Sequence, residues 1–107
     1  MSVLLEDNEI KQEISKAERT ILFEDKKTRI TFWRFAPGSE TGWHQHTYDY
    51  VTLQQSSGKL KLENRNGSTK VINYQDGYAG SYSAPIEHNA TNVGDVEIRV
   101  TEIEYKM

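Results

Sequence analysis

The residues best suited to chemistry in this sequence are its three histidines. His44 and His46 follow a Pro-Gly turn and are spaced as His-x-His, and His88 lies about forty residues later. In a β-strand, side chains alternate between two faces, so His44 and His46 would point the same way, about 7 Å apart along the backbone. Two such imidazoles can bind one metal ion. The spacing alone leaves open whether the fold brings His88 to them.

Any such metal must be held by nitrogen and oxygen ligands, because the chain has no cysteine. Three neutral imidazoles would leave open positions for water or substrate and would suit Fe, Zn, Ni, Cu or Mn, with identity set largely by availability. A carboxylate added to the set would favour Mn or Fe.

Composition indicates one folded domain that does not bind nucleic acid. The chain has 107 residues, of which 36% are hydrophobic and 10% aromatic, and its net charge is −3. Lysines and arginines form no cluster of the kind that binds phosphate backbones. No apolar stretch is long enough to span a membrane, and the N-terminus does not resemble a secretory signal, so we expect a cytoplasmic protein and no membrane partner.

The elements that position the histidines are predicted to be β-strands. Residues 1–19 are ambiguous, and we expect an N-terminal arm that forms a strand or a short helix. From residue 20 to residue 107, short alternating or β-rich runs are separated by turn signals, which predicts an all-β sandwich or barrel of the jelly-roll type. The expected strands cover residues 21–23, 29–35, 48–54, 59–63, 69–74, 78–83, 86–91 and 96–101.

Two motifs make the sequence resemble the cupin superfamily, whose members are small jelly-roll barrels also called double-stranded β-helices. Gly38, the His-x-His pair and Gly58 follow the first cupin motif, and Gly77, His88 and Asn92 fall in register with the second. The text around Arg34–Val51 also looks like short bacterial single-domain cupins, some of which are associated with β-alanine catabolism. The resemblance implies that His44, His46 and His88 bind one metal.

The fourth ligand departs from this resemblance, because Tyr50 stands where cupins usually have a metal-binding glutamate. Asp49 is the nearest carboxylate. If the strand is unbroken from His46, Tyr50 and Gln54 face inward and Asp49 faces outward. A β-bulge after His46 would instead turn Asp49 inward and make it a possible ligand.

Three further residues are candidates for contact with a substrate: Tyr50, Arg34 and Gln54. Tyr50 would donate a hydrogen bond, or would simply pack. Arg34 would bind a substrate carboxylate if it faces inward and is a surface charge if it faces outward. Gln54 is either a donor near the metal or an ordinary strand residue.

The function expected from these features is a metal-dependent enzyme that acts on a small polar or carboxylate-bearing molecule. Dioxygenase, isomerase and lyase chemistry stay open. The alternatives are a non-catalytic module that binds a metal or small ligand, and a structural dimer with a degenerate site. We also expect a homodimer that pairs through a sheet edge, with an arm that exchanges between subunits.

Overall fold

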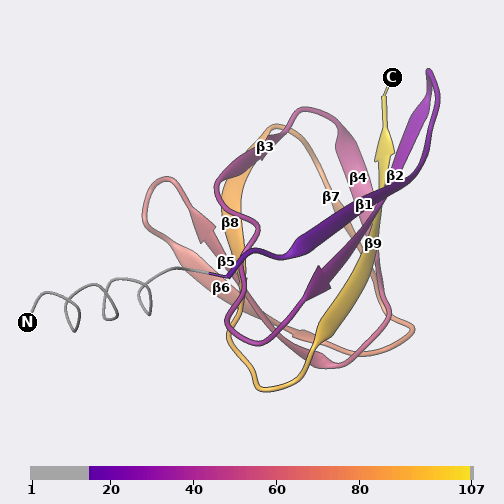
Figure 1. Cartoon of the computed structure of the whole chain (residues 1–107). Helices are drawn as coiled ribbons and strands as arrows, with labels where there is room; N and C mark the ends of the chain where they lie inside the picture. The colour runs from indigo at the N-terminus through magenta and orange to yellow at the C-terminus, as the bar shows by residue number, and fades with distance from the viewer. Residues whose placement is uncertain (1–14, 107) are drawn as a thin grey trace, which may run out of the picture.

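The computed structural model describes residues 15–106, and these form nine β-strands and no helix. The strands make two antiparallel sheets, in the order β1-β2-β9-β4-β7 and β3-β8-β5-β6, that fold around one interior (Figure 1). This arrangement confirms the predicted all-β barrel. The strands are β1 (Glu18–Glu24), β2 (Thr28–Phe35), β3 (His44–His46), β4 (Asp49–Gln54), β5 (Gly58–Asn64), β6 (Thr69–Tyr74), β7 (Ala79–Tyr82), β8 (Ile86–Asn92) and β9 (Ile98–Tyr105).

The strand positions follow the patterns of the sequence closely, with differences at both ends of the chain. Asn66 and Gly67 form the turn of the β5–β6 hairpin. β1 begins at Glu18, two residues before the expected start of the barrel. The predicted N-terminal arm lies mainly on residues 1–14, which are outside the described residues, so the arm and its exchange stay predictions.

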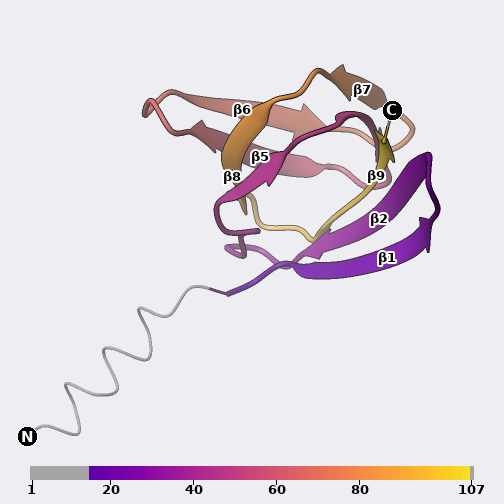
Figure 2. The same ribbon diagram turned by 90° about the horizontal axis from the view of Figure 1, so that it is seen from above.

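Alternation along the strands builds the interior. In the five-stranded sheet, inward positions of β2 lie opposite inward positions of β9, for example Trp33 opposite Val100 and Phe35 opposite Ile98. Figure 2 shows β1 and β2 on one side of the barrel and β5, β6 and β8 on the other. The buried apolar core lies between these walls and consists of Trp33, Phe35, Leu60, Tyr74, Ala90, Ile98 and Val100.

Asn92, the last residue of the second motif, has a structural role. Its side chain is 1% exposed, and its Nδ2 donates hydrogen bonds to the carbonyl oxygens of Phe35 and Val96 at 3.1 and 2.8 Å. Its Oδ1 accepts a hydrogen bond from the backbone N–H of Gly94. Asn92 therefore joins the end of β2 to the β8–β9 turn, and satisfies buried backbone groups that would otherwise be costly.

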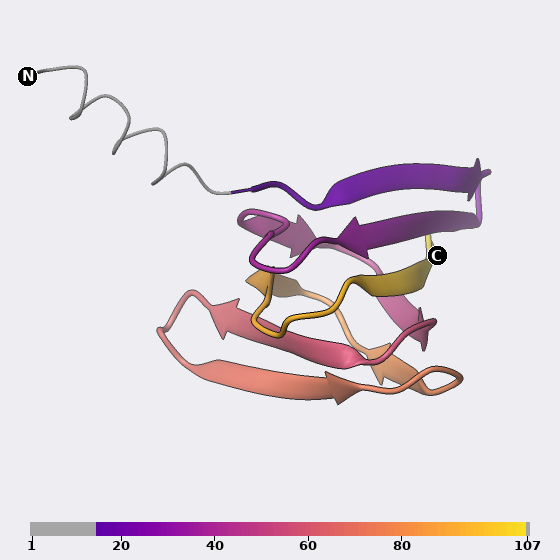
Figure 3. The ribbon, with the colours of Figure 1, turned by 60° about the horizontal axis from the view of Figure 1, so that its bottom comes forward.

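Four strands form the edges of the two sheets: β1 and β7 in the five-stranded sheet, and β3 and β6 in the four-stranded sheet. β1 and β6 lie at the outside in Figure 3. Every residue of β1 is exposed. No helix capable of crossing a membrane occurs in residues 15–106. The cytoplasmic location stays a prediction.

Candidate metal centre

Strand pairing brings the three histidines together. β3 and β8 are antiparallel neighbours, and His44 lies directly opposite His88 in their register. His46 is two residues further along β3, so it points to the same face as His44. Among the described residues, these three form the one group of possible metal-binding side chains, with ligand atoms within 4.8 Å of one another.

The Nε2 atoms of the three rings face one another. The Nε2 atom of His44 lies 3.0 Å from that of His46 and 3.1 Å from that of His88. The Nδ1 atom of His44 lies 3.0 Å from the carbonyl oxygen of Gly42. A carbonyl only accepts, so Nδ1 of His44 carries the proton and its Nε2 lone pair points into the cluster.

A metal ion fits this geometry. Lone pairs 3.0 Å apart repel unless a cation or a proton lies between them. Two nitrogen ligands at about 2.1 Å from a metal and at right angles to each other are about 3.0 Å apart, which agrees with both observed separations. The donor set is therefore suited to a cation that takes three imidazoles on one face.

Burial also favours the neutral form of the rings that binds metals. His46 and His88 are 5% and 6% exposed. Desolvation lowers the pKa of each to about 4, helped in both cases by the charge of His44. Burial likewise lowers the pKa of His44. All three rings are thus neutral near pH 7, as ligation requires.

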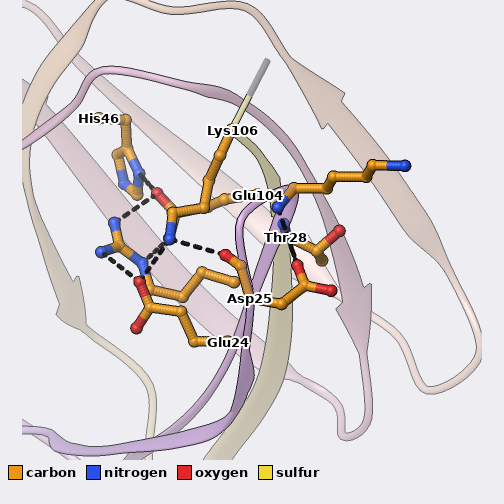
Figure 4. A network of polar contacts seen from close by, with 8 residues as sticks. Glu24, Asp25, Thr28, His46, Glu104 and Lys106 are labelled. Carbon is orange, nitrogen blue, oxygen red and sulfur yellow. Dashed lines mark hydrogen bonds and ion pairs between the residues drawn. The ribbon is translucent and has the colours of Figure 1, made fainter.

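A buried carboxylate lies behind His46. Glu104, on β9, is 4% exposed, and its Oε2 lies 3.8 Å from Nδ1 of His46 (Figure 4). Arg29 donates to both oxygens of Glu104, at 2.6 and 3.2 Å. Arg29 also lies 3.8 Å from Glu24, whose carboxylate accepts a hydrogen bond from Lys106. This network ends at the Nδ1 edge of the His46 ring, on the side away from the cluster. A carboxylate in this position orients a ligating imidazole.

Asp49 lies outside the cluster. Exposure alternates from His46 to Gln54 without a bulge, so Tyr50 is buried and Asp49 is exposed. The carboxylate of Asp49 accepts a hydrogen bond from the backbone N–H of Ala84 instead. The bulge that would have made Asp49 a fourth ligand does not form.

The three candidate substrate contacts lie in different places. Tyr50 is in the interior, 2% exposed, and its ring stacks on His46 with centroids 4.1 Å apart. Arg34 is on the outer face, where it pairs with Glu97 at 3.7 Å, so the outward alternative holds. Gln54 is buried but accepts a hydrogen bond from the backbone N–H of Gln75, in the β6–β7 turn. Of these, Tyr50 alone adjoins the histidines.

A pocket of about 300 Å³ opens beside His44 and His46. It contains charged side chains that the sequence did not single out, among them Arg19, Glu102 and Glu104. Arg19 is exposed on β1 and forms no ion pair within residues 15–106. Continuing the alternation of Val96–Thr101 to residue 104 would have placed both glutamates on the inner face. Alternation near a strand end does not show whether the end is covered, so it does not distinguish a buried glutamate from a solvated one.

Glu102 is the most perturbed carboxyl of the site. It accepts a hydrogen bond from Nε1 of Trp33 at 3.0 Å. Burial raises the pKa of Glu102 to about 7, although the Trp33 hydrogen bond and the nearby Arg19 lower it. A carboxyl that changes charge near neutral pH in a pocket is a common mark of a functional group.

Comparison with known proteins gives one curated relative and many similar structures. No protein-family model matches the chain. The β-alanine degradation protein BauB of Pseudomonas aeruginosa is 36% identical over 91 residues, which cover 85% of this chain and 95% of that protein.

Solved structures agree on the fold. A cupin domain from Bordetella pertussis has a TM-score of 0.84 and 34% identity, covering 90% of this chain and 99% of its own. A protein with a double-stranded β-helix domain from Klebsiella pneumoniae has a TM-score of 0.70 and 20% identity, covering 85% and 77% of the two chains. A cupin-like protein from Thermotoga maritima has a TM-score of 0.67 and 17% identity, covering 89% and 80%.

Proposed function

Since the chain belongs to the cupin superfamily and its three histidines converge, we propose that it is a metal-dependent enzyme acting on a small polar or carboxylate-bearing molecule. The observation that carries the proposal is the convergence of three neutral Nε2 atoms 3.0–3.1 Å from their neighbours, beside an open pocket. The curated relative is named for β-alanine degradation, which supports a small carboxylate as the substrate.

The residues favour particular metals. His44, His46 and His88 would hold the ion, and the position of Asp49 leaves the set without a carboxylate. Imidazole ligands suit Fe, Zn, Ni and Cu, whereas Mn prefers oxygen ligands. A bound divalent ion would supply Lewis-acid or oxygen-activating chemistry, which is the basis of the dioxygenase, isomerase and lyase alternatives.

The pocket can orient a carboxylate next to the histidines. Arg19 lies at the pocket, and its charge acts on His44. A guanidinium binds a carboxylate through two parallel hydrogen bonds. Arg19 therefore takes the role expected of Arg34. Tyr50, stacked on His46, closes the interior side of the cluster and limits the access of water.

Metal content is the first experiment. We expect about one equivalent of Fe, Zn, Ni or Cu per chain after reconstitution, and loss of binding in His44→Ala and His88→Ala. The matched control is Glu87→Ala, because Glu87 adjoins His88 but is exposed and pairs with Arg65. Less than a few tenths of an equivalent in the unmodified protein would contradict the proposal and leave a degenerate site.

Turnover separates an enzyme from a binding module. The metal-loaded protein is incubated with a panel of small carboxylic acids, with oxygen uptake measured by electrode and products by NMR. We expect turnover of at least one acid, absent in His44→Ala. Oxygen uptake identifies a dioxygenase, and a product formed without it identifies an isomerase or lyase. Metal binding without any turnover would support the non-catalytic alternative.

A further inference from the structure

Glu102 lies at the centre of a polar row inside the barrel that the metal centre does not use. In the sheet register, Glu102 on β9 is flanked by Thr31 on β2 and by Thr52 on β4, all on the inner face. Glu102 and Thr31 line the pocket beside His44 and His46, whereas Glu102 and Thr52 line a smaller interior cavity that reaches His44 and His88. The row therefore adjoins the histidine cluster.

The two threonine hydroxyls have no hydrogen-bond partner among the described residues. Thr31 and Thr52 are 2% and 5% exposed, yet the Oγ1 atom of each makes no hydrogen bond. Tyr82 lies beside Thr52, whose hydroxyl lowers the pKa of Tyr82, but the two hydroxyls form no hydrogen bond of standard geometry. A buried hydroxyl without a partner costs stability, so native proteins rarely keep one on each side of a carboxyl without a use.

Glu104 is a useful comparison, because its buried carboxylate has charged hydrogen-bond donors. Glu104, two residues along β9, receives two hydrogen bonds from Arg29. Glu102 receives one, from Trp33, and no cation pairs with it within the described chain. The row thus presents a carboxyl and two hydroxyls that can all accept a hydrogen bond, and no charged donor to fill them.

We propose that Glu102, Thr31 and Thr52 form a binding subsite for a hydrogen-bond-donating group of the ligand, either a hydroxyl or an ammonium. The inference rests on the proposed function in taking the ligand to be a small carboxylic acid held near the histidines. With Arg19 on the carboxylate and the row on the donor group, the pocket selects small hydroxy or amino carboxylic acids. Its volume of about 300 Å³ accommodates molecules of this size.

The test compares three acids that differ at one position: propanoate, 3-hydroxypropanoate and 3-aminopropanoate. Binding is measured by calorimetry on metal-free and on metal-loaded protein. We expect 3-hydroxypropanoate or 3-aminopropanoate to bind at least about tenfold more tightly than propanoate, as a hydrogen bond to a charged group provides. Equal affinities for the three acids, or no binding of any, would overturn the inference.

Variants of Glu102 identify the group and its partner. Glu102→Met keeps the volume and removes both acceptor atoms, so the preference over propanoate should disappear. Glu102→Gln removes only the charge, so a preference for the ammonium should be lost while one for the hydroxyl is kept in part. A preference that survives Glu102→Met would contradict the proposed subsite.

The threonines supply a readout that is independent of ligand affinity. Thr31→Val with Thr52→Val removes two unpaired hydroxyls at nearly constant shape, so the melting temperature should rise while the preference falls. Thr101→Val is the matched control, because the Thr101 hydroxyl on β9, next to Glu102, donates to Gln55 at 2.7 Å. That variant should melt lower and keep the preference. A lower melting temperature for the double variant would contradict the unpaired state of its hydroxyls.

Failure of this inference differs from failure of the proposed function. If metal binds and an acid is turned over without any preference, the subsite alone is wrong. If the preference is present in a protein that holds no metal, the subsite stands and the metal-dependent function fails.

Discussion

At the scale of single residues, the site depends on which ring nitrogen of each histidine faces inward. Gly42 fixes this for His44, because its carbonyl oxygen accepts a hydrogen bond from Nδ1. Glu104 has the corresponding position behind His46, although at 3.8 Å from Nδ1. Arg29 holds the Glu104 carboxylate in place from the other side. The orientation of His46 is therefore determined by a chain of charges that starts outside the metal centre.

This arrangement predicts that Glu104 is a positioning residue for metal binding. Glu104→Gln removes the negative charge behind His46 and weakens its contact with Arg29. We expect metal affinity to fall by about tenfold or more, as is usual when a partner behind a ligating histidine is changed. The affinity is measured by competition with a coloured chelator.

Glu97→Gln is the control, because Glu97 is an exposed acid that pairs with Arg34 and Arg99 away from the histidines. It should leave metal affinity unchanged. Equal affinity in Glu104→Gln and the unmodified protein would show that Glu104 serves the fold alone.

At the scale of strands, most of the fold could be predicted because its alternation is regular. The pattern placed strands within a few residues of β2 and of β4 through β9, and parity correctly turned Tyr50 inward. Whether β4 begins with a bulge depends on the packing of the strands around it, which one sequence does not reveal. Unbroken alternation along β4 turns Asp49 outward, and alternation along β2 turns Arg34 outward.

The charged residues of the interior could not be predicted in this way. Glu102 and Glu104 occupy inward positions of β9, but a glutamate at a strand end is usually solvated. Their burial comes from β2, β4 and the β3 segment, which are far away in the sequence. Arg19 was missed for another reason: it is the last residue of the predicted arm, whereas β1 begins at Glu18.

Gly58 shows how closely strands β5 and β9 approach. Its φ is +143°, and a Cβ added there would lie 2.6 Å from Cγ1 of Ile98, which is fully buried. Gly58→Ala should therefore lower the free energy of unfolding by about 2 kcal/mol or more, through overpacking and backbone strain. Urea unfolding monitored by tryptophan fluorescence measures this loss.

Gly67→Ala is the matched comparison in the β5–β6 turn. Gly67 also has a positive φ, of +90°, but a Cβ there would meet nothing within 4 Å. Strain alone should cost about 1 kcal/mol. Equal losses in the two variants would mean that contact with Ile98 does not determine the cost at Gly58.

At the scale of the whole molecule, the β1 edge of the five-stranded sheet predicts a homodimer. On β1, Ile21, Leu22 and Phe23 are 43%, 58% and 52% exposed. An unpaired edge strand with apolar side chains is a ready template for another strand, and a second copy of this chain supplies one. We expect light scattering after size exclusion to give twice the chain mass of 12.3 kDa.

Substitutions on β1 and on β6 test whether the dimer pairs through β1. Leu22→Glu with Phe23→Glu places charge on the β1 edge and should give a monomer. Val71→Glu is the control on β6, an edge of the other sheet, where Val71 is 49% exposed. It should remain a dimer. A monomeric unmodified protein, or a dimer in both variants, would contradict pairing through β1.

The central claim is that three histidines form one metal centre, and X-ray absorption spectroscopy of the metal-loaded protein tests it most directly. The account predicts three imidazole nitrogens at about 2.1 Å and one metal per chain, and the loss of that metal in His46→Ala, as in His44→Ala. A spectrum without imidazole scattering, or one unchanged in His46→Ala, would contradict it.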